Sequence, residues 1–183
     1  RIYADFYKEK DAKFIAGPVT FYQEKTLFER IQTIEFSSLI GSGASFLGLG
    51  YPNMCNGANL AYQKKMTEEL NAYEGNEQIA SGDDEFLMHK IFEKYPKDVH
   101  FLKSKKAIVQ TKGHTSLKNF YYQRKRWASK WNQYQFNYIT ILAVGVLLFN
   151  FLLSIGFVLA IFDLVSYSYL LLGFSVRMAI DYL

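Results

Sequence analysis

Two adjacent carboxylates open an amphipathic run and are the first candidates for chemistry. The stretch ASGDDEFLMHK carries Asp83 and Asp84, and the apolar spacing that follows predicts a helix over residues 83–95 with Ser81 as its N-cap. The helix dipole favours an ionised carboxylate at this end, which is a sufficient structural reason for the acids. A general base that takes a proton from an attacking hydroxyl also needs an ionised carboxylate on a rigid support. Spacing alone leaves both explanations open.

A second candidate is the stretch FYYQRKRWASKW (residues 120–131), in which cations are interleaved with aromatic rings. On a helix, Gln123, Arg126 and Trp127 lie on one face. Arginine presents a planar fork that suits phosphate oxygens, and tryptophan presents a flat apolar face that suits a sugar ring. The alternative is a basic collar that faces anionic lipid head groups, for which Gln123 and Trp127 would not be needed.

The third candidate is the stretch CNGAN (residues 55–59). Gly57 permits a close approach of the backbone, and Asn56 and Asn59 offer amide donors and acceptors. Taken alone, an ordinary turn before a helix is the favoured explanation. The histidines share no ligand spacing and the single Cys55 supports no zinc site, so no metal site is predicted within this chain.

Strands and helices alternate before the apolar end of the chain, which predicts an α/β layered fold. Residues 13–21 predict a strand that Gly17-Pro18 interrupts, and residues 99–111 predict one or two strands. A short polar helix is expected near residues 63–70, and a longer one over residues 116–135.

A further amphipathic helix is predicted before a glycine-rich stretch. One face carries Leu27, Phe28, Ile31, Ile34 and Leu39, and the other carries Glu24, Glu29, Arg30 and Gln32. The apolar face packs on the core or lies on a membrane surface. Residues 41–52 contain too much glycine to remain regular, so the helix is expected to end before them.

The apolar end predicts membrane insertion. Residues 139–162 carry no charge and are long enough to cross a bilayer, and a second apolar run after Asp163 predicts a helical hairpin. Arg177 and Asp181 are spaced to pair on one helix face or, alternatively, to mark the membrane surface. Cations precede the first span, so the preceding part of the chain is expected in the cytoplasm. A net charge of +4 does not select a partner class.

The three candidate stretches resemble, in order, motifs of the membrane-integrated family 2 glycosyltransferases, which include cellulose, hyaluronan and poly-N-acetylglucosamine synthases. QRKRW is similar to the family's Q-x-x-R-W motif, and GDDEFL is similar to its T-E-D element, with Asp83 where the family usually has glutamate. CNGAN resembles the acceptor-site turn, and FIAGPVTF resembles a strand in the middle of the catalytic domain. The resemblance covers essentially the whole chain.

This resemblance implies an architecture. Residues 1–135 would be the C-terminal part of a GT-A (Rossmann-like) catalytic domain with amphipathic interface helices, and residues 136–183 would be transmembrane helices, the second one truncated. The chain is therefore expected to be an internal part of a longer protein. The expected location is a bacterial inner membrane, with the catalytic part in the cytoplasm.

The resemblance also implies roles for individual residues. Asp84, with Asp83 beside it, would be the catalytic base that activates the acceptor hydroxyl. The donor diphosphate would be bound by Gln123, Arg124 and Arg126. The acceptor would be bound by Trp127, Asn56 and Gly57. The family's D-x-D motif, which binds Mg²⁺ or Mn²⁺, lies upstream of this region, so the divalent metal is expected in the full-length enzyme and this chain alone is expected to be inactive.

The implied reaction is an inverting transfer of a hexosyl or N-acetylhexosaminyl group from a nucleotide-diphosphate sugar, with a UDP-sugar as the expected donor. The acceptor would be a saccharide or a lipid-linked acceptor at the cytoplasmic face of the bilayer, in the synthesis of a polysaccharide or a glycolipid. Nucleic acid is not an expected partner. The alternative is a catalytically inactive, membrane-anchored binding or scaffold protein.

Overall fold

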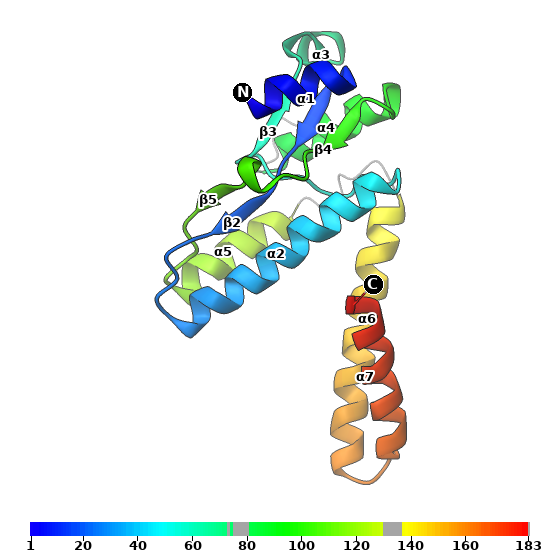
Figure 1. The fold of residues 1–183 in the computed structure, drawn as a ribbon. Helices are drawn as coiled ribbons and strands as arrows, with labels where there is room; N and C mark the ends of the chain where they lie inside the picture. The colour runs from blue at the N-terminus through cyan, green and yellow to red at the C-terminus, as the bar shows by residue number, and fades with distance from the viewer. Residues whose placement is uncertain (73, 75–80, 130–136, 183) are drawn as a thin grey trace. The chain divides into compact units, whose positions relative to one another are not determined.

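The computed structural model describes residues 1–72, 74, 81–129 and 137–182 (Figure 1). The chain divides into two compact units, Arg1–Gln135 and Phe136–Leu183, and each is described by itself below. The first unit is a mixed α/β structure with two small sheets, and the second is helical.

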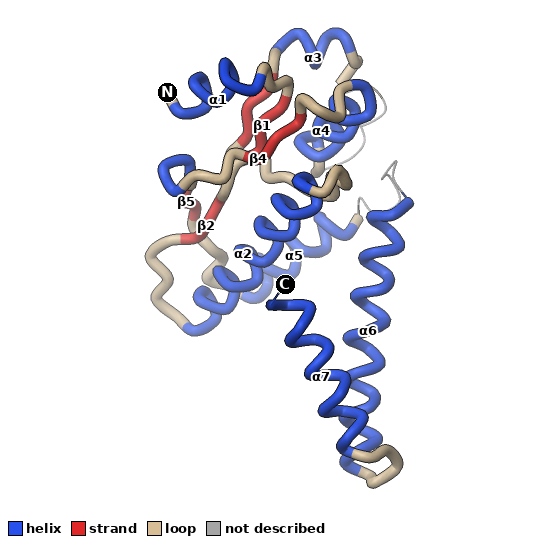
Figure 2. Tube along the Cα trace, turned by 45° about the vertical axis from the view of Figure 1, so that its right-hand side comes forward, coloured by secondary structure: helices blue, strands red, loops and turns tan. Residues whose placement is uncertain are grey.

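The first unit is organised around a three-stranded sheet with β1 (Phe14–Ala16) at its centre. Strand β3 (Leu60–Tyr62) pairs with β1 in antiparallel orientation, and β4 (Val99–Phe101) pairs with it in parallel orientation. Figure 2 shows β1 and β4 side by side in red.

A second, two-stranded sheet continues from the first. Strand β2 (Val19–Phe21) pairs in parallel with β5 (Val109–Thr111). The predicted interruption at Gly17-Pro18 is confirmed, because these two residues separate β1 from β2. The prediction of one or two strands over residues 99–111 is also confirmed, since β4 and β5 are separated by the short helix η1 (Lys105–Ala107).

The alternation of side chains along β1 places a core on each face of the sheet. Ile15 is buried in a cluster with Leu102 and Ala107, against which α1 (Ile2–Lys10) packs through its apolar residues. Phe14 and Ala16 belong to a second cluster. That cluster contains Leu47 of α2 (Leu27–Gly48), Met66 of α3 (Lys64–Glu69), and Leu87, Met88 and Ile91 of α4 (Asp83–Lys94).

Helix α4 confirms the predicted helix but not its predicted cap. Phe86, Leu87 and Ile91 are buried as the apolar spacing requires. The N-cap is Gly82, not Ser81, and no side chain caps the helix. Gly82 has a φ of 102°, a conformation that glycine adopts without steric cost, so the chain enters the helix through a left-handed residue.

The prediction that residues 41–52 are irregular is wrong for the first part of that stretch, because α2 continues to Gly48. Tertiary packing explains the difference. Gly43 is buried against residue 54, where a Cβ on residue 43 would lie 2.8 Å from the carbonyl oxygen of Met54. Leu47 is buried in the core one turn later. Burial of this turn outweighs the low helix propensity of glycine.

Of the two alternatives for the apolar face of α2, packing on the core does not hold for most of its residues. Leu27 and Ile34 expose 74% and 70% of their surface, whereas Glu29 and Gln32 are buried. The buried polar groups have partners. Glu29 accepts a hydrogen bond from the Lys25 amide (2.6 Å). The Gln32 side chain binds both the amide (3.1 Å) and the carbonyl (2.8 Å) of His114.

Helix α5 (Leu117–Ala128) follows Ser116 and confirms the start of the predicted last helix of this unit. The end predicted near residue 135 lies outside the described residues. In the second unit, α6 (Asn137–Ile161) and α7 (Tyr167–Tyr182) are joined by a turn that contains Asp163 (φ 55°).

Helices α6 and α7 lie side by side (Figure 1). The Arg177 guanidinium donates to Asn150 Oδ1 across them (2.5 Å). The predicted partner of Arg177, the Asp181 side chain, lies outside what the structure describes. Among the described residues, one helical segment, Ala143–Ile161, is long and apolar enough to cross a membrane, with a mean hydropathy of 2.5.

Candidate active site

The two candidate carboxylates on α4 differ in their surroundings. Asp83 is exposed, whereas Asp84 is half-buried. Both lie in the first turn of the helix, where the aligned amides favour negative charge. The structure therefore distinguishes Asp84 as the carboxylate that lies against another part of the chain.

That part is the CNGAN turn. The Asn56 side chain accepts a hydrogen bond from the Ala58 amide (2.9 Å), and the Asn59 amide donates to the Asn56 carbonyl (3.0 Å). A Cβ on Gly57 would lie 3.2 Å from Asp84 Oδ2. A side chain at residue 57 would be in tight contact with the carboxylate, so two of the three candidate stretches meet here.

The turn is anchored by Asn59, which is buried. Its Nδ2 donates to the carbonyls of Pro18 and Ala107 (both 2.7 Å), and its Oδ1 accepts from the Tyr3 hydroxyl (2.5 Å). These partners come from the strand linkers and from α1. Asn59 is therefore a structural residue that fixes the turn. Asn56, three residues earlier in the same turn, stays partly accessible.

The third candidate stretch lies on α5, where its residues do not share one environment. Arg126 is exposed, and Gln123 and Trp127 are half-buried. Trp127 packs against the cluster of Val19, Phe21 and Phe36. Among the described residues, no hydrogen bond or ion pair joins these side chains to Asp84 or to the CNGAN turn.

Arg124 has the most contacts of the basic residues on α5. Its Nη2 pairs with the Glu35 carboxylate on α2. The guanidinium carbon lies 4.7 Å from the Phe120 ring centroid and 4.3 Å from that of Trp127. Burial raises the pKa of Glu35 and lowers the pKa of Arg124, and the attraction between the two opposes each shift without cancelling it.

Sequence reasoning missed Glu35, although a signal was present. Between Arg30 and Lys64, Glu35 is the one charged residue in the sequence. A carboxylate that is partly removed from water on a packed helix is expected to pair with a cation or a hydrogen-bond donor. Glu85 and His89 were missed as well; both are buried and lie four residues apart on α4.

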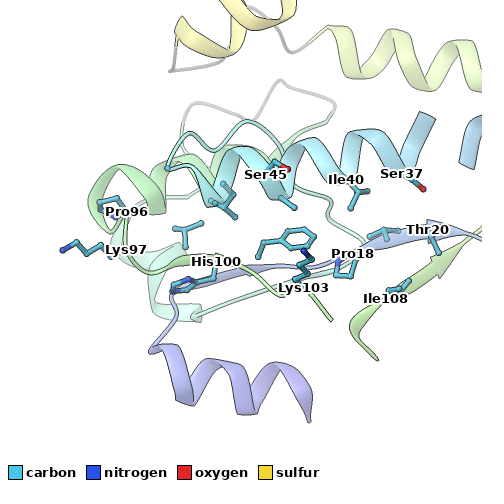
Figure 3. A pocket seen from close by; sticks show the side chains of 18 residues that line it. Pro18, Thr20, Ser37, Ile40, Ser45, Pro96, Lys97, His100, Lys103 and Ile108 are labelled. Carbon is cyan, nitrogen blue, oxygen red and sulfur yellow. The ribbon is translucent and has the colours of Figure 1, made fainter. Parts of the chain in front are cut away.

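A groove of about 950 Å³ lies between α2 and the strands. Figure 3 shows Ser37, Ile40 and Ser45 of α2 on one side and Pro18 and Thr20 on the other. None of the predicted site residues lines it, so the groove is separate from the candidate chemistry.

The described residues offer no group of three or more histidine, cysteine, aspartate or glutamate side chains placed to hold a metal ion. The residues present therefore do not fit a metal centre by themselves. No step of the reaction proposed below uses a metal.

A mixed α/β unit with small sheets is consistent with a glycosyltransferase domain. The sequence matches the family model described as Glycosyl transferase family group 2 over residues 1–180, and the chain belongs to this family. Searches among curated proteins and among solved structures found no match. A family 2 glycosyltransferase domain moves a sugar from a nucleotide-sugar donor to an acceptor, which sets the reaction class of the chain.

Proposed function

We propose that the chain comprises the C-terminal part of a GT-A catalytic domain and the transmembrane helices that follow it, and that the full-length enzyme is an inverting glycosyltransferase that uses a nucleotide-diphosphate sugar and a saccharide or lipid-linked acceptor. The observation that supports this most directly is the position of Asp84. Its half-buried carboxylate lies beside the backbone of Gly57, in a turn that resembles the acceptor site of the family. A hydroxyl bound at this turn would be within reach of a base.

In the proposed step, Asp84 accepts the proton of the acceptor hydroxyl as that oxygen bonds to the anomeric carbon of the donor. The bond between the anomeric carbon and the diphosphate oxygen breaks, and its electron pair leaves with the nucleotide diphosphate. Attack opposite the leaving group inverts the configuration. Asp83 is exposed and is not among the atoms nearest to Gly57, so it is the second choice as base.

For the donor, we propose that Gln123 and Arg126 bind the diphosphate. Arg126 is exposed, and its guanidinium makes no ion pair among the described residues, so its planar fork is open to phosphate oxygens. Trp127 would contact the acceptor sugar, together with Asn56 and Gly57. The divalent metal stays a proposal for the full-length enzyme; when bound by a D-x-D motif it would supply charge neutralisation of the diphosphate.

The proposed location is the cytoplasmic face of a membrane. The uncharged segment Ala143–Ile161 supports a span, and cations of α5 precede it while Asp163 follows it. The exposed apolar residues Leu27, Ile31 and Ile34 of α2 support contact of this helix with the bilayer surface. The proposal includes α7 as part of the membrane region.

The test is Asp84→Asn in the full-length enzyme. The amide keeps the shape of the carboxylate but cannot accept the proton, so donor binding should persist while transfer falls by about 10²–10⁴. Asp83→Asn is the matched control, because it removes one charge from the same helix turn. Near-normal transfer by Asp84→Asn would contradict the assignment, and absence of transfer by the wild-type enzyme would favour the scaffold alternative.

A further inference from the structure

Arg124 lies in the same motif as Gln123 and Arg126, yet its guanidinium is paired with a carboxylate of the protein and partly covered from solvent. Its Nη2 is held by Glu35. Its Nε and Nη1 are covered from solvent and have no acceptor among the described residues. A diphosphate would have to displace Glu35 or uncover these nitrogens, whereas it meets no such obstacle at the exposed Arg126.

The covered face of the guanidinium lies against aromatic rings. Phe120, Arg124 and Trp127 follow one another at helical spacing, so they form one stripe on α5. A cation close to an aromatic ring is a favourable contact, and the guanidinium carbon of Arg124 lies close to both rings. Trp127 therefore has the Arg124 guanidinium as a direct neighbour.

Each residue of the stripe on α5 contacts a residue of α2 or a cluster that contains one. Phe28 meets Phe120 edge-on, with ring centroids 5.7 Å apart. Glu35 then binds Arg124, and Phe36 lies in the cluster against which Trp127 packs. The Glu35–Arg124 ion pair is the polar contact between these aromatic contacts, and it joins α5 to α2 directly.

We propose that Glu35 and Arg124 form a clamp between α2 and α5 that positions Trp127 for the acceptor sugar, and that Arg124 does not bind the donor diphosphate. The acceptor part of this inference rests on the proposed function.

The kinetic test uses the full-length enzyme in detergent and compares Glu35→Gln, Arg124→Lys and Trp127→Ala. We expect Glu35→Gln and Arg124→Lys each to raise the acceptor KM by about three- to tenfold, the range of a lost cation–π contact, with nucleotide Kd unchanged. Glu35→Asp should restore part of the effect. The matched control is Glu68→Gln, which removes an exposed ion pair with Lys64 (4.0 Å).

The decisive comparison is between Trp127→Ala and the double variant Trp127→Ala with Glu35→Gln. Once Trp127 is alanine, Glu35→Gln should cause no further rise in acceptor KM, because the clamp would have nothing left to position. A general loss of folding would instead add its effect in both backgrounds. Additive effects, or a nucleotide Kd at least tenfold weaker in Glu35→Gln or Arg124→Lys, would overturn the clamp.

Tryptophan fluorescence tests the clamp independently of transferase activity. Subtracting the emission spectrum of Trp127→Phe from that of the wild type isolates the emission of Trp127. The same subtraction in a Glu35→Gln background should give an emission maximum at longer wavelength, because the indole is less covered there. An unchanged difference spectrum overturns the clamp. If the spectrum shifts but Trp127→Ala leaves the acceptor KM unchanged, the clamp stands and the acceptor role in the proposed function is wrong.

Discussion

Gly57 and Asp84 come from different segments and meet where a side chain on residue 57 would be in tight contact with the carboxylate. The carboxylate lies at the N-terminus of α4, and the turn is fixed by the buried hydrogen bonds of Asn59. Both parts are held by the core, so the approach is a property of the folded unit. If Asp84 is the base, as proposed, its position depends on the residue that faces it.

Gly57→Ala is the variant that tests this dependence. The added Cβ would lie 3.2 Å from Asp84 Oδ2, which obliges the carboxylate to shift by a few tenths of an ångström. We expect transfer to fall by up to roughly tenfold, because a base must be held close to its proton. Gly48→Ala is the control, since a Cβ there meets no atom within 4 Å. Equal transfer rates in the two variants would contradict the contact.

Variants of Arg126 and Trp127 should lose different properties if Arg126 binds the donor and Trp127 binds the acceptor. Arg126→Ala should weaken nucleotide binding by roughly ten- to a hundredfold, and Arg126→Lys should recover only part of it, because an ammonium lacks the planar fork. Trp127→Ala should leave nucleotide affinity intact and impair acceptor use. The measurement is nucleotide affinity and transfer in detergent; if neither changes there, the lipid-collar alternative is favoured.

At this scale the sequence indicated which stretches to examine but not how their residues are placed. Neighbouring positions in the first turn of a helix look alike in sequence, so Asp83 and Asp84 separate only when the CNGAN turn is seen beside one of them. Arg124 is likewise equivalent to Arg126 until Glu35 is seen to bind it. Contacts between distant segments decide both points, and no local pattern contains them.

At the scale of elements, two of the three glycines of α2, Gly41 and Gly43, differ in what faces them. Gly43 is buried against the Met54 carbonyl, whereas a Cβ on Gly41 meets no atom within 4 Å. Glycine within a helix is usually unfavourable relative to alanine, so its presence at position 43 requires a packing reason. The two residues therefore form a matched pair.

Gly43→Ala should lower the melting temperature of the protein, because the Cβ would clash with a backbone oxygen that cannot move without shifting residue 54; overpacking of this kind costs about 1–3 kcal/mol. Gly41→Ala should raise the melting temperature slightly, since alanine favours the helix by roughly 0.5–1 kcal/mol. Thermal unfolding of the two variants in the same detergent measures both. Similar shifts in the two would show that residue 54 does not pack on α2 as described.

The same helix shows where a sequence pattern gives the wrong answer. Glycine content predicted an early end, but burial of Gly43 and Leu47 extends the helix. Apolar spacing left open whether Leu27 and Ile34 pack on the core or lie on a membrane surface. In the structure both are exposed, and hydrogen bonds let Glu29 and Gln32 be buried instead. In contrast, α4 and the strands flanking Gly17-Pro18 were predicted, since there burial agrees with the local pattern.

At the scale of the whole molecule, the apolar segment Ala143–Ile161 is the observation on which the proposed membrane location rests. Nearly all of it is exposed in the folded chain, which is the opposite of what a core helix of a soluble protein requires. The segment carries no charge, and the basic residues of α5 precede it. The proposal is therefore that this segment crosses a bilayer with the cations on the cytoplasmic side.

Cysteine labelling tests this topology directly. Single cysteines would replace Ser116, at the start of α5, and Ser166, in the turn between α6 and α7, in a full-length background from which Cys55 and any other cysteine have been removed. In sealed right-side-out vesicles, an impermeant maleimide should label position 166 and should reach position 116 only after permeabilisation. This follows because an uncharged helix of about 20 residues crosses once, and the flanking cations stay in the cytoplasm. Labelling of position 116 alone would reverse the orientation, and equal labelling of both before permeabilisation would mean that α6 lies on one side of the membrane and does not cross it.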